Sequence, residues 1–408
     1  LWQNPRETRA TGGFIGTYGL MTVSDAEIVS MKTDNVYNLD DPAERHLRIR
    51  PPMPILKYFP PKERWWFLRD SNWSPHFPES AAIAEDFYHK EGGKEKIDGV
   101  IAMTPDVIAS LLWIVGSVTV QGITFDADHF AEQLEYQVEK GYYQRGIPES
   151  QRKEVIGTIL DEIMTRIYDL PLEKVAQIIP ALKRHLDQKQ LLLWMHDPSL
   201  QNLVLSAGWG GAVLPAKSDY LMIVDSNMIS AKTDSVMDKE IRSQLNRGTD
   251  GSLTVHLELT YRHRSLPTWN ITRYKDYVRA YVPPGSTLLS SSGFVASDRS
   301  DEKGEIDISQ EHGKVVFGGF LVVEPKGSKT VTLDYKLPQS VVDTVNDGMY
   351  TIFVQKQSGI SNQLFTLDMR GLNLLRNPYP RQCRASDRGA FVCETDMVID
   401  REFSFPLQ

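Results

Sequence analysis

Residues 253–261 read LTVHLELTY, with apolar and polar residues in strict alternation. Successive side chains of a β-strand point to opposite faces, so this stretch predicts a strand with one buried face. Short strands are also expected over 278–282, 315–323, 330–335 and 350–356, with Gly-containing turns between them. Strands at this spacing are typical of a β-sandwich. We expect an all-β sandwich domain over residues 249–408, which ends in a tail that contains both cysteines.

The region before the sandwich mixes helix and strand patterns. Apolar residues recur at positions i, i+4 and i+8 from Ser150 to Tyr168, which predicts an amphipathic helix with Ser150 as its N-cap. A second helix is expected over Leu172–Leu186, weakened or kinked at Pro180. Residues 1–248 are therefore expected to form an α/β domain.

Four short apolar stretches of this region have the length and flanking residues of strands. With the helices they predict a mixed sheet, and the helical periodicity is lost near residue 250. We expect the domain boundary at Thr249–Ser252. The four predicted strands are Thr17–Val23, Ile97–Met103, Gln190–Met195 and Tyr220–Asp225.

Composition excludes several classes of protein. The chain has 408 residues, 41 % of them apolar and 24 % charged, as in a globular protein with more than one domain. Its net charge of −8 disfavours nucleic acid, because a phosphate-backbone partner requires a basic surface. The sequence contains no Gly-x-Ser-x-Gly motif of serine hydrolases and no Walker phosphate-binding loop. It also contains no His-Glu-x-x-His motif and no Cys/His cluster with the spacing of a zinc site.

The longest nearly uninterrupted apolar run, Leu111–Val120, is about half of the roughly 20 residues that a spanning helix needs. The sequence opens Leu-Trp-Gln-Asn-Pro, without a start Met or a signal peptide. We therefore expect a fragment whose natural N-terminus, with any membrane anchor on it, lies upstream.

The two cysteines, Cys383 and Cys393, lie close together in a polar, arginine-rich tail. A Ser-Asp-Arg-Gly turn between them favours a disulfide-closed hairpin, and two free thiols are the alternative. A disulfide favours an oxidising, extracytoplasmic location.

Two motifs near the N-terminus carry candidate anion-binding residues. In the first, Arg6 and Arg9 flank Glu7, and a following Gly pair allows close approach of the backbone. In the second, Arg69 and Asp70 lie among tryptophans whose planes could stack on sugar rings. The alternatives are a solvated loop for the first motif and core packing for the second. The tryptophans considered for sugar stacking are Trp66 and Trp73.

Two further positions complete the candidates. Asp98 lies where the chain enters a predicted apolar strand. An aspartate at such a position is more often a turn residue than a catalytic residue. Arg145 and Arg152 precede the predicted helix at 150–168, and a helix N-terminus attracts anions through its free N–H groups and its dipole. Solvated surface arginines are the alternative for this pair.

Several of these motifs together resemble the family named domain of unknown function 4012, which occurs in bacterial cell-envelope proteins, typically behind an N-terminal membrane anchor. The resemblance spans nearly the whole chain. It is carried by residues 4–16 (NPRETRATGGFIG), 68–75 (LRDSNWSP), 98–102 (DGVIA), 219–222, 227, 232–234, 277–283 and 354–359.

The order of motifs more distantly resembles the LytR-CpsA-Psr family of cell-wall phosphotransferases. These enzymes move a glycopolymer from a polyprenyl-pyrophosphate carrier onto peptidoglycan, with arginines and magnesium around the pyrophosphate. Their opening Asp-x-Arg is similar to residues 7–9, their Pro-Arg-Asp to residues 68–70, and their Val-Asp to residues 97–98. Their later Arg-x-x-Arg-Gln helix is similar to residues 149–153.

This resemblance implies a site in which three arginines converge on a pyrophosphate and neutralise charge on the leaving group. Where the phosphotransferases carry a metal-binding Arg-Ser-Asp, residues 15–19 of this chain contain no carboxylate, so the Mg²⁺ ligand set is reduced to Glu7 and Asp70. The implied catalytic residues are Arg9, Arg69, Asp70 and Arg152, and the implied substrate-binding residues are Arg6, Glu7, Arg145, Trp66, Trp73 and Asp98.

Three functions follow as expectations. The first is a phosphotransferase-like protein on the extracytoplasmic face of the bacterial membrane, with a LytR-CpsA-Psr-like α/β domain and a β-sandwich. The second is a non-catalytic protein of the cell envelope that binds glycan or a lipid-linked precursor. The third is a glycoside hydrolase that uses paired carboxylates such as Glu7 and Asp70.

Overall fold

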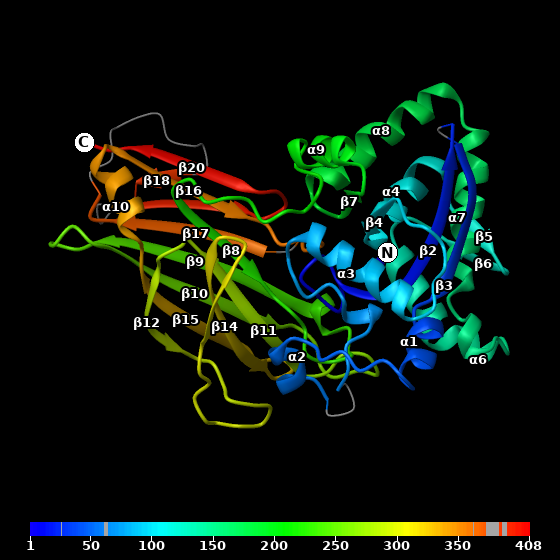
Figure 1. Cartoon of the computed structure of the whole chain (residues 1–408), viewed down its shortest axis with the longest axis horizontal. Coiled ribbons are helices and arrows are strands. Elements are labelled where there is room, and N and C mark those ends of the chain that lie inside the picture. The colour runs from blue at the N-terminus through cyan, green and yellow to red at the C-terminus, as the bar shows by residue number, and fades with distance from the viewer. Residues whose placement is uncertain (26, 61–63, 362, 373–382, 386–389) are drawn as a thin grey trace. The chain divides into compact units, whose positions relative to one another are not determined.

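The chain folds into two compact units, each of which is described by itself (Figure 1). The computed structural model describes residues 1–25, 27–60, 64–361, 363–372, 383–385 and 390–408. Both units are discontinuous in sequence, because two short early segments belong to the later unit. Unit 1 comprises residues 1–5, 11–51 and 63–212, and unit 2 comprises residues 6–10, 52–62 and 213–408.

Unit 1 contains a five-stranded mixed sheet of order β3-β2-β1-β4-β7. Strands β2 and β3 form a hairpin; β1 is antiparallel to β2 but parallel to β4, and β4 is antiparallel to β7. A separate hairpin, β5–β6, lies outside this sheet. The strands are β1 (Trp2–Asn4), β2 (Phe14–Ser24), β3 (Glu27–Asn35), β4 (Gly99–Met103), β5 (Val118–Val120), β6 (Ile123–Phe125) and β7 (Leu191–Met195).

Helices of unit 1 bury their apolar faces in several small cores. The largest core joins α4, α5 and α7 to the β5–β6 hairpin, and α7 contributes the apolar stripe that the sequence predicts. The helices are α1 (Tyr37–Ala43), α3 (Phe77–Lys90), α4 (Pro105–Val115), α5 (Phe130–Tyr136), α6 (Tyr142–Gln144), α7 (Glu154–Tyr168), α8 (Leu172–Asp187) and α9 (Pro198–Ser206).

The start of one predicted helix differs in the structure. Residues 149–151 form a single 3₁₀ turn after Pro148, so α7 begins only at Glu154, and its N-cap is Lys153 rather than Ser150. Pro at the start of a turn has the backbone angle that the turn needs, which explains the extra turn before the helix. Helix α8 runs through Pro180 over nearly the span that the sequence predicts.

Unit 2 is the β-rich region, and its two sheets share one core. The seven-stranded sheet has the order β12-β15-β10-β9-β17-β19-β18, and the six-stranded sheet has the order β13-β14-β11-β8-β16-β20. The elements are α2 (Met53–Tyr58), β8 (Asp219–Val224), β9 (Met237–Arg247), β10 (Leu253–His263), β11 (Tyr274–Val282), β12 (Thr287–Ser292), β13 (Asp307–Glu311), β14 (Lys314–Val323), β15 (Ser328–Lys336), α10 (Gln339–Asn346), β16 (Met349–Gln355), β17 (Gln363–Arg370), β18 (Cys383–Ala385), β19 (Phe391–Asp396) and β20 (Arg401–Pro406).

The alternation in residues 253–261 explains how β10 contributes to this core. Every second residue of β10 points inward and is at most 2 % exposed, and these residues pack in one cluster with apolar residues of the six-stranded sheet. Fully burying a Leu or Val side chain stabilises the fold by about 1.5–3 kcal/mol. The inward residues are Leu253, Val255, Leu257, Leu259 and Tyr261.

The domain boundary lies earlier than the sequence predicts. Strands β9 and β10 pair along their whole length, and Leu253 faces Arg247, so Thr249–Ser252 is a hairpin turn inside unit 2. The units divide between Ala212 and Val213 instead. The loss of helical periodicity near residue 250 does not mark the boundary between the units, because β8 and β9 of unit 2 lie before that residue.

A disulfide joins Cys383 of β18 to Cys393 of β19. The two residues face each other across an antiparallel strand pair, with a Cα–Cα distance of 4.0 Å.

Candidate functional site

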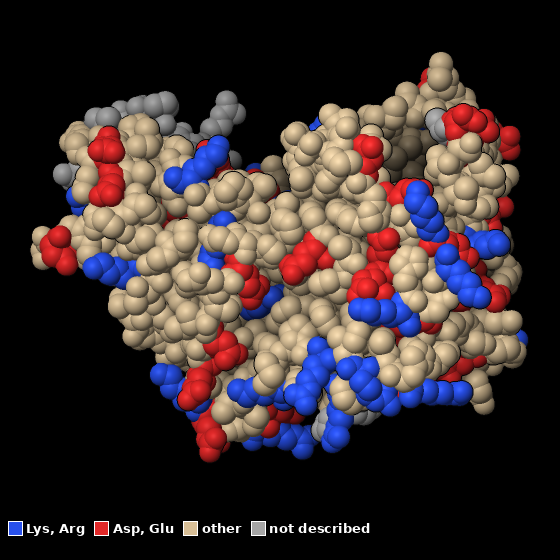
Figure 2. Space-filling view, viewed as in Figure 1, with Lys and Arg blue, Asp and Glu red and all other residues tan. Residues whose placement is uncertain are grey.

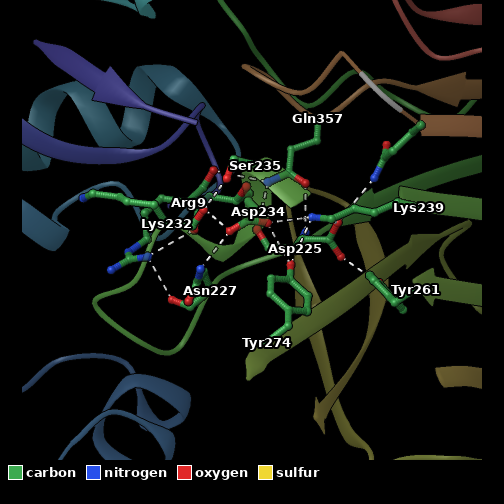
Figure 3. Close-up of polar contacts among 12 residues, drawn as sticks. Arg9, Asp225, Asn227, Lys232, Asp234, Ser235, Lys239, Tyr261, Tyr274 and Gln357 are labelled. Carbon is green, nitrogen blue, oxygen red and sulfur yellow. Dashed lines mark hydrogen bonds and ion pairs between the residues drawn. The ribbon is translucent and has the colours of Figure 1, made fainter. Parts of the chain in front are cut away.

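The first predicted motif, residues 6–10, is built into unit 2 by hydrogen bonds (Figure 3). The backbone N–H of Thr8 donates to Asp234 over 3.0 Å, and the Thr8 carbonyl accepts from the N–H of Asn227. Arg9 donates through Nη1 to the carbonyl of Asn227 over 2.8 Å, and its own carbonyl accepts from Gln357. The motif is therefore a buried structural segment rather than the solvated loop of the alternative reading.

Glu7 is held by two cations. Its Oε1 lies 3.1 Å from Nη2 of Arg9, and its Oε2 lies 2.9 Å from Nζ of Lys232. The Glu7 side chain is 3 % exposed. Both carboxylate oxygens already face positive donors, which repel a divalent cation, so this arrangement does not fit Mg²⁺ at Glu7.

Next to this motif, a lysine lies between buried aspartates in the centre of unit 2 (Figure 3). Lys239 Nζ lies 3.0 Å from Asp225 and 2.9 Å from Asp234, and Tyr274 donates its hydroxyl to Asp234. Burial favours the neutral form of Asp234, but the charge of Lys239 and several hydrogen bonds outweigh it and lower the pKa of that carboxyl. Asp234 is thus a carboxylate at neutral pH.

Asp276 on β11 completes this cluster and was not a candidate from the sequence. It is fully buried, and no N–H or O–H donor of the described residues reaches either carboxyl oxygen. Burial, followed by the charge of nearby Asp225, raises the pKa of Asp276 well above its usual range. Asp276 therefore keeps its proton at neutral pH and can donate it to Asp225.

In unit 1, the second predicted motif is also held by carboxylates. Arg69 lies in a 3₁₀ turn, Leu68–Asp70, and its Nη1 lies 2.9 Å from Asp40 of α1. Asp70 is 3.7 Å from the same guanidinium, and Glu44 is 3.6 Å away. The Arg69 side chain is only 7 % exposed, so it forms a buried ion-pair network.

A buried carboxyl pair lies behind Arg69. Glu91, the C-cap of α3, accepts from the N–H of Leu68 over 2.9 Å and lies beside Asp40. Burial, followed by its hydrogen bond with Asp40, raises the pKa of Glu91 to about 9. Glu91 is therefore protonated at neutral pH and shares its proton with Asp40, a role that sequence spacing does not indicate.

Lys153, rather than the predicted Arg152, lies against the Tyr37 ring that Arg69 also contacts. Lys153 Nζ lies 5.5 Å from the centre of the Tyr37 ring and donates to the carbonyl of Gly16, and the Arg69 guanidinium lies 5.6 Å from the same ring. Arg152 instead pairs with Glu139 over 2.9 Å.

The remaining predicted residues make local contacts. Arg145 donates to Gln121 over 2.8 Å, and Asp98 is an exposed residue that pairs with Lys96. Trp66 donates its indole N–H to the carbonyl of Asp70 and packs edge-on against Phe87. Trp66 is thus a packing residue, in line with the alternative reading. Trp73 and Arg6 are both partly buried.

Unit 2 contains a charged pocket that the sequence analysis did not identify. It has a volume of about 510 Å³ and lies where the loop between β12 and β13 passes from one sheet to the other. Acidic and basic side chains are interspersed at this end of unit 2, in the lower part of Figure 2. The only sequence signal is the run of charged and hydroxyl residues at 297–303. The pocket is lined by Arg273, Val295, Ser297, Arg299, Ser300, Asp301, Val322, Glu324 and Lys329.

The cations of this pocket differ in how they are held. Arg273 bonds Asp298 over 2.7 Å and Glu324 over 2.6 Å, which fixes its guanidinium in the wall. Within the described part of the chain, Arg299 and Lys329 make no ion pair with a carboxylate. These two side chains are the ones that can bind an anion from outside.

The described residues form neither a cluster of metal ligands nor a membrane-spanning helix. They include no group of three His, Cys, Asp or Glu side chains placed to hold a metal ion. In the same residues, no helix combines the length and the apolar character needed to cross a membrane.

Comparison with known proteins gives one family match. The family model described as protein of unknown function DUF4012 matches residues 1–138, which supports that resemblance for the first third of the chain. No curated protein matches the sequence.

Solved structures show only remote similarity. A protein of Legionella pneumophila for which nutrient binding is suggested is 7 % identical, with a TM-score of 0.30, 47 % of this chain covered and 71 % of that chain. Leukotriene A4 hydrolase of Saccharomyces cerevisiae is 8 % identical, with a TM-score of 0.24 and coverage of 41 % and 29 %. An M1 zinc metallopeptidase of Deinococcus radiodurans is 11 % identical, with a TM-score of 0.21 and coverage of 42 % for both chains. Such low scores support no inference about function.

Proposed function

We propose that this chain is a non-catalytic protein of the bacterial cell envelope that binds an anionic glycan, or its lipid-linked precursor, in the pocket of unit 2. The observation that carries the proposal is the composition of that pocket. Its volume of about 510 Å³ is within the usual range for ligand sites.

The chemistry of the lining favours an acidic sugar over other ligands. Arg299 and Lys329 supply positive charge for a phosphate or carboxylate. Glu324 and Asp301 can accept hydrogen bonds from sugar hydroxyls, and nearby serine hydroxyls can donate or accept. An apolar ligand would leave these polar groups without partners, at a cost of about 1–3 kcal/mol for each buried group.

The proposed location has separate support. The disulfide between Cys383 and Cys393 is of a kind that persists in oxidising compartments and is rare in the cytosol. An envelope protein outside the membrane meets glycans and their polyprenyl-linked precursors directly.

Calorimetric titration tests the binding function. We expect a phosphate-bearing oligosaccharide to bind wild-type protein and a neutral oligosaccharide of equal length to bind much more weakly. Replacing Arg299 by Ala removes a charge-assisted hydrogen bond worth about 1.5–3 kcal/mol, which weakens binding roughly ten- to hundred-fold. Arg262→Ala is the matched control, because Arg262 is an exposed arginine of the same unit that pairs with Glu240 outside the pocket. Equal affinity of both variants would refute the proposal.

A phosphotransferase remains the second candidate, and one observation favours it. Arg69 and Lys153, far apart in sequence, face the same Tyr37 ring in unit 1. Incubation of the protein with a polyprenyl-pyrophosphate glycan and a peptidoglycan acceptor, with and without added Mg²⁺, tests it. Phosphodiester-linked product that disappears in Lys153→Ala but not in Lys174→Ala, an exposed residue of α8, would favour transfer over binding alone. Glu7 and Asp70 are each paired with arginine, and this pairing gives no support to a hydrolase.

A further inference from the structure

We propose that the side chains of Lys239 and Asp225 join in an intramolecular isopeptide bond, with Asp276 as the acid–base group that promotes its formation. The proposal concerns a covalent modification inside unit 2 and is independent of the ligand that the pocket binds.

The geometry brings a nucleophile to an electrophile. Lys239 Nζ lies 3.0 Å from Asp225 Oδ2, and both side chains are buried, with 4 % and 0 % exposed. The carbon that the amine attacks, Cγ, is bonded to this oxygen, and reacting groups held in contact behave as though present at very high concentration, which removes most of the entropic barrier. Lys239 lies on β9 of the seven-stranded sheet and Asp225 follows β8 of the six-stranded sheet, so the bond would link the two sheets.

The surroundings activate Asp225 rather than Asp234. Tyr261 donates its hydroxyl to Asp225 Oδ1 over 2.7 Å. Asp276 is buried, neither of its carboxyl oxygens has a hydrogen-bond partner among the described residues, and it interacts electrostatically with Asp225, so its proton is available to the same carboxyl group. Two donors on one carboxyl polarise its carbonyl and stabilise the charge that develops during attack. Asp234 also contacts Lys239, but the charge of Lys239, the Thr8 N–H and the Asn227 side chain keep it ionised, and a carboxylate is a poor electrophile.

The reaction balances without any added reagent. The Lys239 ammonium transfers one proton to the Asp225 carboxylate, which leaves a neutral amine beside a neutral carboxyl. The amine attacks Cγ of Asp225, the C–OH bond breaks, and the hydroxyl leaves as water with the proton of Asp276. Asp276 then recovers a proton from the attacking nitrogen. One amide and one water form, and Asp276 is regenerated.

Burial provides a driving force for this reaction. The ammonium and the carboxylate have both lost their hydration, which costs several kcal/mol for each ion in a protein interior. The amide is neutral, so the condensation removes the charges of Lys239 and Asp225. Asp234 loses its cation, but it keeps the hydrogen bonds from the Thr8 N–H, the Asn227 amide and the Tyr274 hydroxyl. Water is excluded from the cluster, which also protects the amide from hydrolysis.

Mass spectrometry of the purified, reduced protein tests the proposal. We expect the intact mass to be lower than the sequence mass by one water. Acylated Lys239 resists trypsin, so digestion should yield a branched species in which residues 218–232 are joined to residues 233–242. The full sequence mass, with cleavage after Lys239, would overturn the proposal.

The digest also distinguishes the two aspartates. A bond to Asp234 would lie within residues 233–242 alone and would leave residues 218–232 as a free peptide, which would overturn the assignment to Asp225. Wild-type protein decides both questions, even where a variant fails to fold.

Two variants test the assigned roles. Asp276→Asn keeps the shape of the side chain but cannot relay the proton, and we expect folded protein of full mass; water loss equal to that of wild-type would refute the role of Asp276. Lys314→Arg is the matched control, because Lys314 is equally buried but donates to the carbonyl of Leu214 over 2.6 Å, and it should retain the loss of water.

Discussion

Glu91 offers a direct test of the carboxyl pair in unit 1, through the substitution Glu91→Gln. A glutamine accepts from the Leu68 N–H as Glu91 does, and its amide donates to Asp40 at every pH. Wild-type Glu91 can donate to Asp40 only while it is protonated. The variant therefore keeps both hydrogen bonds but has no ionisable group at position 91.

The sign of the pH effect follows from proton counting. Burial, followed by the hydrogen bond with Asp40, raises the pKa of Glu91 from 4.5 to about 9, so between these values the native state binds a proton that the unfolded state has released. The stability contributed by this proton is complete below the unfolded pKa and is lost as pH rises toward 9. The free energy of unfolding should fall by up to about 1.4 kcal/mol per pH unit in this window.

Urea denaturation at pH 5, 6, 7 and 8, followed by tryptophan fluorescence, measures this slope. The signal reports on unit 1, because all tryptophans except Trp269 lie in that unit. We expect the free energy of unfolding of Glu91→Gln to depend less steeply on pH than that of wild-type, with a difference of up to about 4 kcal/mol over this range. Parallel pH profiles would show that Glu91 is ionised in the native state and would refute the carboxyl pair.

Three further predictions concern stability. Arg69→Ala should lower the free energy of unfolding by about 3–5 kcal/mol, because it leaves Asp40 buried without its cation, and urea denaturation should show little change for the exposed Arg48→Ala. Leu257→Ala should cost about 2–5 kcal/mol through a cavity in the sandwich core, against less than about 0.5 kcal/mol for the exposed Leu289→Ala. The disulfide should add about 3 kcal/mol to stability, and thiol titration of denatured, unreduced protein should find no free thiol; two reactive thiols would contradict it.

Local patterns were enough to predict several individual elements. Alternation over residues 253–261 and the apolar stripe of α7 predicted a strand and a helix that the structure contains, because each pattern reflects one exposed and one buried face of a single element. The mixed α/β region followed by a β-rich region could likewise be read from the change in periodicity.

Tertiary structure alone decided which residues come together. Residues 6–10 carry an arginine motif, yet Arg9 pairs with Glu7, and the backbone of Thr8 is bonded to residues more than 200 positions away. Nothing in the local sequence reveals such a partner. The same holds for Arg152, whose side chain turns to Glu139 while the next residue, Lys153, contacts the ring that Arg69 also contacts.

The cluster of Asp225, Lys239 and Asp276 shows most clearly why the sequence alone could not predict the candidate sites. Each residue lies at the end of or within an ordinary strand pattern, and the spacing of the three matches no motif. Their reactivity depends on burial and on the 3.0 Å approach of Lys239 to Asp225 from one sheet to the other. A sequence determines the faces that strands bury, whereas the approach of charged groups inside unit 2 arises only when its two sheets pack.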